Sequence, residues 1–136
     1  MLADDDSSIR TMLGRILETE HCVVVASTGR EAASQFLSGH PPDLVLLDLN
    51  MPDKDGWEAC HLIRTLDTLV PVIVITARPN QYEEAARRGV DALMEKPLDL
   101  PLLIQSIDDL LRESDESRYR RRHDPNFKTA FLASRP

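Results

Sequence analysis

Short apolar runs alternate with helical apolar stripes along the first 113 residues of the chain. Three runs are rich in β-branched and aliphatic residues and are bounded by turn residues: 22–25, 44–47 and 72–75. Such runs are typical of strands that are buried on both faces of a parallel sheet. Between them, apolar residues recur at the spacing of one helical face, in stripes that begin near residues 9, 59 and 100. The pattern therefore predicts alternating strands and helices.

Five strand–helix units in succession predict an α/β protein, with a parallel sheet and helices on both faces. The first strand is expected to be truncated, because only Met1 to Ala3 precede an acidic cluster and a typical strand has about 5–6 residues. The helix expected over 79–88 has only Tyr82, Ala85 and Ala86 on its apolar face, so it should be weakly anchored.

Charge divides the chain near residues 114–117. Residues 1–113 contain 10 basic and 20 acidic residues, whereas residues 114–136 contain 6 basic and 3 acidic residues. The stretch Ser114-Asp115-Glu116-Ser117 resembles a polar linker. We therefore predict one folded domain over 1–113, followed by a basic, disordered tail over 114–136.

Composition narrows the functional classes. The net charge of −7 argues against a dedicated nucleic-acid binder, so nucleic acid is not an expected partner. No apolar run reaches the roughly 18 residues of a membrane span, and the acidic start does not resemble a secretory signal. A cytoplasmic protein without membrane insertion is therefore expected. Cys22 and Cys60 lie in apolar segments without metal-ligand spacing, which predicts free thiols in the core.

Side chains that can bind a metal ion or a phosphoryl group lie at the ends of four of the predicted strands. The first strand is followed by Asp4 and Asp5, the third ends at Asp48, the fourth at Thr76, and the fifth precedes Lys96. Ligands of doubly wound sheets bind at these carboxyl ends. Neighbouring carboxylates repel one another unless a cation or proton intervenes, and hard oxygen donors favour Mg²⁺. A phosphoryl group would fit among the metal, the lysine and the hydroxyl, and a central carboxylate can itself be the nucleophile.

These residues belong to four motifs that occur in order: Leu2-Ala3-Asp4-Asp5-Asp6, Leu44–Pro52 with Asp55-Gly56, Val74–Ala77, and Glu95-Lys96-Pro97. Together they resemble the CheY-like receiver domain of two-component response regulators, and the resemblance covers residues 1–113. It implies a doubly wound, five-stranded parallel sheet with the flavodoxin-like strand order 2-1-3-4-5.

The resemblance also implies a role for each matched residue. Asp48 would be the phosphoacceptor, and Thr76 and Lys96 would bind the phosphoryl oxygens. The cofactor would be Mg²⁺, with these ligands: Asp4 through a water molecule, Asp5, Asp48 and the backbone carbonyl of Asn50.

By this resemblance the chain is a signalling phosphoacceptor, not an enzyme in the ordinary sense, although it assists its own phosphotransfer and dephosphorylation. A histidine kinase or phosphotransfer protein would supply the phosphoryl group. The surface of the fourth helix, fifth strand and fifth helix would then change and bind a downstream protein. Leu93 stands where the family often has a switching Tyr or Phe, so the aromatic half of the usual switch is missing.

Four alternatives stay open. A Mg²⁺ phosphohydrolase would need an acid–base group two residues after its nucleophile, where Asn50 stands. A receiver-like module could bind partners independently of phosphorylation. The chain could also be the receiver fragment of a longer DNA-binding regulator or hybrid kinase. Finally, the arginine-rich tail could make weak, salt-sensitive contacts with nucleic-acid phosphates.

Overall fold

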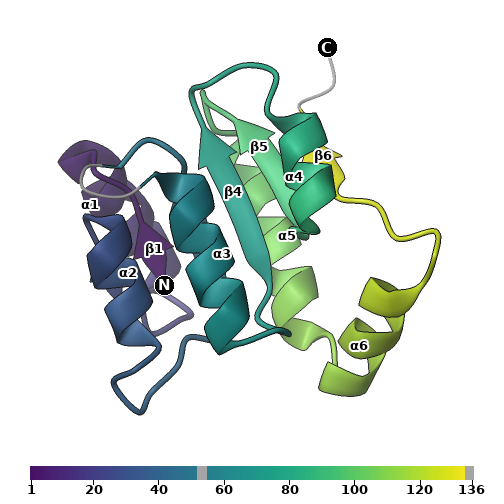
Figure 1. The fold of residues 1–136 in the computed structure, drawn as a ribbon. Helices are drawn as coiled ribbons and strands as arrows, with labels where there is room; N and C mark the ends of the chain where they lie inside the picture. The colour runs from purple at the N-terminus through teal and green to yellow at the C-terminus, as the bar shows by residue number, and fades with distance from the viewer. Residues whose placement is uncertain (52–54, 134–136) are drawn as a thin grey trace.

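The computed structural model describes residues 1–51 and 55–133, and these form one open parallel sheet with helices on both faces (Figure 1). The sheet has six strands in the order β2-β1-β3-β4-β5-β6. The predicted order 2-1-3-4-5 is confirmed for the first five strands. The sixth strand was not predicted, and it comes from the segment expected to be a tail.

The strands are β1 Leu2–Ala3, β2 Val25–Ala26, β3 Val45–Asp48, β4 Val72–Thr76, β5 Ala92–Glu95 and β6 Ala130–Leu132. The helices are α1 Ser7–Leu17, α2 Gly29–Gln35, α3 Gly56–Leu66, α4 Tyr82–Arg88, α5 Leu100–Arg112 and α6 Asp115–His123. The expected truncation of the first strand is confirmed, since β1 has two residues. Pro52, the last residue of the motif Leu44–Pro52, lies outside the described residues.

Successive residues of the central strands point to opposite faces of the sheet and fill two apolar layers. Val45 and Leu47 pack with residues of α2, α3 and α4, whereas Leu46 packs with residues of α1 and α5. Figure 1 shows the same division, with α2, α3 and α4 in front of the sheet and α1 and α5 behind it. Because helices cover both faces of the sheet, every residue of the central strands β3 and β4 is buried, and their sequences are therefore continuously apolar up to the last residue.

The ends of the helices adjoin the carboxyl ends of the strands. Asp6 caps α1 by accepting backbone N–H bonds from Ser8 and Ile9, and Asp99 caps α5 in the same way through Leu102.

The expected weak anchoring of α4 agrees with its burial, since Ala85 is its one buried residue among the seven. Cys60 is buried as expected, but Cys22 is exposed, because it precedes β2 instead of lying within it.

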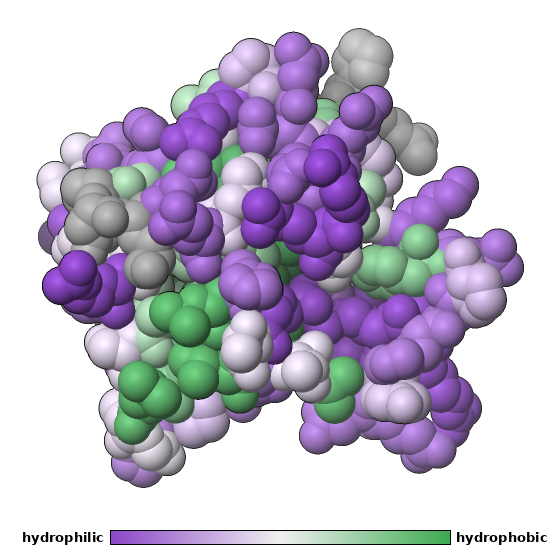
Figure 2. Space-filling model, viewed as in Figure 1, coloured by the Kyte–Doolittle hydropathy of each residue, from purple (hydrophilic) through white to green (hydrophobic). Residues whose placement is uncertain are grey.

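The structure has a helix, α6, and a strand, β6, within residues 114–136, where the sequence predicts a disordered tail. Ser114 caps α6 by accepting from the N–H of Ser117, and β6 adds to the outer edge of β5. The surface around α6 is mostly hydrophilic (Figure 2), so a hydrophobic stripe does not hold the helix. Instead, its arginines pair with carboxylates that lie earlier in the chain, Asp91 and Glu113. Composition counted within the tail alone cannot reveal those partners.

Among the described residues, none of the helices has both the length and the hydrophobicity needed to cross a bilayer.

Candidate functional site

Four strands deliver polar side chains to one edge of the sheet. Asp4 directly follows β1, Asp48 ends β3, Thr76 ends β4, and Lys96 directly follows β5. The strands are parallel and adjacent, with Asp48 opposite Ile75 in the ladder between β3 and β4. The carboxyl ends of parallel strands therefore bring these residues together, as the sequence predicts.

Lys96 links the two buried carboxylates of the site. Its Nζ lies 3.1 Å from Oδ2 of Asp4 and 3.5 Å from Oδ2 of Asp48. Asp5 completes an acidic group, because one carboxylate oxygen from each of Asp4, Asp5 and Asp48 lies within 4.8 Å of the others. Asp4 and Asp48 are buried, whereas Asp5 is exposed at the mouth of the site.

Backbone N–H groups orient the two buried carboxylates. Oδ1 of Asp4 accepts from the N–H of Asp6 at 2.9 Å, and Oδ1 of Asp48 accepts from the N–H of Asn50 at 3.2 Å. In both residues Oδ1 is thus occupied by backbone, and Oδ2 faces Lys96. The arrangement leaves one oxygen of Asp48 directed into the site.

Burial makes the charged form of Asp48 costly. Desolvation, with a further contribution from the nearby Asp4 carboxylate, raises the pKa of Asp48 from 3.8 to about 6, although the Asn50 N–H and Lys96 oppose the shift. Burial would lower the pKa of Lys96, but the Asp4 and Asp48 carboxylates outweigh it and raise that pKa. The lysine therefore stays charged, and the site holds an excess of negative charge.

Thr76 is fully buried at the end of β4. Its Oγ1 accepts a hydrogen bond from the backbone N–H of Arg78 at 2.9 Å. That bond uses a lone pair of the hydroxyl, so its proton is still available for an acceptor in the site.

The donor set fits a hard divalent cation. Three carboxylates face one ammonium group, and the ligand atoms on offer are all oxygens, which Mg²⁺ prefers. Asp4, Asp5 and Asp48 would hold the ion, and its charge would offset the repulsion among them. The predicted contribution of the Asn50 carbonyl stays a prediction.

Two features near the site were not predicted from the sequence. Arg78, two residues after Thr76, extends across the mouth of the site, with Nη2 3.4 Å from Oδ1 of Asn50 and Nη1 3.9 Å from Oδ2 of Asp55. Gly56 allows α3 to begin against the segment after β3, because a Cβ there would lie 2.3 Å from the Leu49 Cα. The position of Arg78, two residues after Thr76, could have indicated that it lies near the site. The close approach of Gly56 to Leu49 could not be predicted from the residues around Gly56.

Comparison with known proteins agrees with this geometry. The model of the response regulator receiver domain family matches residues 1–108. The chain is 36% identical over 117 residues to the response regulator MprA of Mycolicibacterium vanbaalenii, covering 84% of this chain and 50% of MprA. It is 30% identical over 113 residues to the chemotaxis protein CheY of Halobacterium salinarum, covering 82% of this chain and 94% of CheY. The chain thus spans about half the length of MprA and nearly all of that CheY.

Solved structures show the same fold. A CheY-like receiver domain protein from Methanospirillum hungatei superposes with a TM-score of 0.76 at 25% identity, covering 88% of this chain and 94% of that one. The response regulator TrrA of Thermotoga maritima, solved in complex with Mg²⁺ and BeF, superposes with a TM-score of 0.71 at 28% identity, covering 80% of this chain and 95% of TrrA.

Receiver domains are signalling phosphoacceptors that generally bind Mg²⁺ at an acidic pocket. Response regulators receive phosphoryl groups from histidine kinases and act on downstream targets. With the family model matching most of the chain, and the fold and acidic site in agreement, this chain belongs to the response regulator receiver domain family.

Proposed function

We propose that Asp48 accepts a phosphoryl group from a histidine kinase or phosphotransfer protein in a Mg²⁺-dependent reaction. The observation that supports this most strongly is the position of Lys96, whose Nζ contacts both Asp48 and Asp4 at the centre of a three-carboxylate cluster. A lysine in that position neutralises charge at the point where a phosphoryl group would add further charge.

The chemistry follows from the groups present. The free oxygen of Asp48 attacks phosphorus, the bond from phosphorus to the donor nitrogen breaks, and the donor imidazole leaves as the neutral ring. Lys96 then donates to a phosphoryl oxygen instead of to the Asp48 carboxylate, and the Thr76 hydroxyl donates to another. When bound, Mg²⁺ supplies charge neutralisation for the phosphoryl oxygens. In this proposal Asp5, Asp48 and the Asn50 carbonyl bind the ion directly, and Asp4 binds it through water.

A hydrolytic enzyme is the weaker candidate. An aspartyl-nucleophile phosphohydrolase needs an acid–base group close to the acyl phosphate, and the residue two positions after Asp48 is an amide, Asn50. Asn50 instead orients Asp48 through its backbone and contacts Arg78 through its side chain. We therefore propose a phosphoacceptor, whose downstream partner is a protein that binds the α4, β5 and α5 surface.

Acetyl phosphate tests the proposal without a cognate kinase. Intact-mass spectrometry of the full chain should show one added phosphoryl group with Mg²⁺ and none with a chelator. Asp48→Asn should not be labelled. Asp43→Asn, which alters an exposed aspartate at the opposite end of β3, should be labelled like the wild type. Labelling of Asp48→Asn at the wild-type rate would refute the assignment, and an unlabelled wild type would favour a phosphorylation-independent module.

A further inference from the structure

The C-terminal segment occupies the outer edge of β5. Strand β6 runs parallel to β5, with Ala92 opposite Ala130, Leu93 opposite Phe131, and Met94 opposite Leu132. The N–H of Ala130 donates to the carbonyl of Asp91 at 3.0 Å. Without β6, β5 would be an exposed edge strand with unpaired backbone groups, which is a template for pairing with another strand.

Helix α4 also contacts this segment. The Tyr82 hydroxyl donates to the carbonyl of Thr129 at 2.5 Å, and the rings of Tyr82 and Phe131 meet edge to face with their centroids 5.8 Å apart. Thr129 is buried, and its Oγ1 donates to the carbonyl of Val90 at 2.7 Å. The segment thus fits a shallow site formed by the edge of β5, the loop before it and the first turn of α4.

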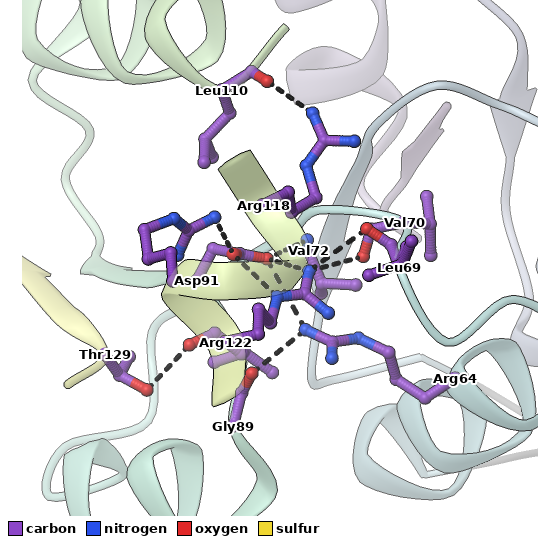
Figure 3. Close-up of polar contacts among 12 residues, drawn as sticks. Arg64, Leu69, Val70, Val72, Gly89, Asp91, Leu110, Arg118, Arg122 and Thr129 are labelled. Carbon is purple, nitrogen blue, oxygen red and sulfur yellow. Dashed lines mark hydrogen bonds and ion pairs between the residues drawn. The ribbon is translucent and has the colours of Figure 1, made fainter. Parts of the chain in front are cut away.

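Helix α6 ties this segment to the domain through the buried carboxylate of Asp91 (Figure 3). Arg121 and Arg122 each donate to Asp91 at 2.8 Å. Arg122 also donates to the carbonyls of Thr68 and Val70, both at 2.9 Å. These bonds hold the start of the segment close to β5, so β6 is kept at a high effective concentration.

Strand β6 is short and partly exposed. It has three residues, and Phe131, its largest side chain, is 47% exposed. Such a strand gains little from apolar burial and depends on its tether. The bonds of α6 to Asp91 use residues outside β6, so displacing β6 from β5 would leave them intact.

We propose that residues 124–132 are an intramolecular occupant of a strand-docking site formed by β5 and Tyr82, and that a protein partner reaching this site must first displace β6. The partner would present an extended segment parallel to β5, with a hydroxyl side chain at the position of Thr129, a small one at Ala130 and apolar ones beyond it. The contacts of β6 that support the proposal do not involve Asp48, so failure of the phosphoacceptor assignment would leave it standing.

A peptide with the sequence of residues 124–133, labelled with a fluorophore at its N-terminus, tests this in full-length protein. Ala130→Pro removes the N–H that bonds Asp91, so β6 should leave the edge. In fluorescence polarisation titrations, this variant should bind the peptide about tenfold or more tightly than the wild type, whose site is filled. Ala133→Pro, one residue beyond β6, should behave like the wild type.

Hydrogen exchange gives a second readout. The amides of β5 should exchange faster in Ala130→Pro and regain protection when the peptide is added. Tyr82→Phe removes a bond to the Thr129 carbonyl, so it should also speed the exchange of the β5 amides, by a smaller amount. Tyr119→Phe, at an exposed tyrosine of α6, should leave their exchange unchanged. Equal peptide affinity in Ala130→Pro and the wild type, or unchanged protection of β5 in both Ala130→Pro and Tyr82→Phe, would overturn the proposal.

Discussion

Two ionic clusters lie at the opposite ends of β5, and they have opposite charge balance. Lys96, directly after the strand, lies among Asp4, Asp5 and Asp48. Asp91, directly before the strand, is approached by three guanidinium groups, those of Arg64 at 3.4 Å and of Arg121 and Arg122 at 2.8 Å. The first cluster has three carboxylates for one ammonium group, whereas the second has three guanidinium groups for two carboxylates, since Arg121 also pairs with Glu113.

The difference distinguishes a candidate ligand site from a cluster whose ion pairs hold α6 against the sheet. In the acidic cluster, burial raises the pKa of Asp48 to about 6, which means that its ionised form is poorly solvated until a cation arrives. In the basic cluster, Asp91 also accepts from the N–H of Val72 at 2.8 Å, so both of its oxygens are bonded. An excess of negative charge around a buried carboxylate whose pKa is raised therefore distinguishes the end of the strand at which we propose the functional site.

The largest expected effect comes from Asp91→Ala. Removing the carboxylate leaves three arginines without their shared partner, and breaking a buried ion pair costs about 3–5 kcal/mol. Urea denaturation should show that loss in the free energy of unfolding. Asp109→Ala, at an exposed residue of α5, should change it by no more than about 0.5 kcal/mol. A loss below about 1 kcal/mol in Asp91→Ala would show that the basic cluster does not hold the fold.

The opposite sign is expected for Asp48→Asn in the absence of metal. Because the folded-state pKa of Asp48 is raised from 3.8 to about 6, the folded protein binds more protons than the unfolded chain between these values, and its stability falls as pH rises through them. The asparagine variant avoids this penalty. Above about pH 6 it should be more stable than the wild type by roughly 1–3 kcal/mol.

This gain should fade as the pH falls toward 4, because the carboxyl is then protonated in the folded protein and partly protonated in the unfolded chain. Chemical denaturation in chelator at pH 4 and pH 7.5 measures the difference. A variant less stable than the wild type at pH 7.5 would mean that the acidic cluster is not under electrostatic strain.

Mg²⁺ should stabilise the wild type by a smaller amount. Binding to the folded state alone adds about 1.4 kcal/mol to the free energy of unfolding when the free ion is at ten times its Kd. Thermal melts over a range of Mg²⁺ concentration should show a rising Tm that is reduced in Asp5→Asn and preserved in Asp43→Asn. An identical rise in Asp5→Asn would place the ion elsewhere.

The smallest effect is expected within α6. Arg120 pairs with Glu116 on the exposed side of the helix, and both side chains are largely in solvent. Arg120→Ala should therefore cost no more than about 0.5 kcal/mol, whereas Arg122→Ala, at a residue inside the basic cluster, should cost several times as much. Equal losses for the two variants would contradict the distinction between surface and buried pairs in this helix.

The sequence predicted the acidic end of β5 but not the basic end. Asp4, Asp48, Thr76 and Lys96 each adjoin an apolar run, so hydrophobic periodicity places them at one edge of a parallel sheet. Asp5, the next residue after Asp4, follows from the same pattern. The side-chain contacts of Arg78 depend on loop geometry, which periodicity does not contain.

The basic end escaped prediction because its partners are far apart in sequence. Asp91 and Arg122 are separated by 31 positions and pair only once the sheet and α5 have formed. Helix α6 has no apolar stripe, so the pattern that revealed the other helices was absent. Its Ser114 cap and the acidic first turn after it were present in the sequence, but they were interpreted as a linker.

Borohydride trapping tests the central claim, that Asp48 is the phosphoacceptor, most directly. After reaction with acetyl phosphate and Mg²⁺, borohydride reduces an aspartyl phosphate to homoserine, and peptide mass spectrometry then locates the converted residue. Among the 23 acidic residues of the chain, conversion should occur at position 48 alone and only when Mg²⁺ is present. Conversion at Asp4 or Asp5, or equal conversion without Mg²⁺, would contradict the proposed site.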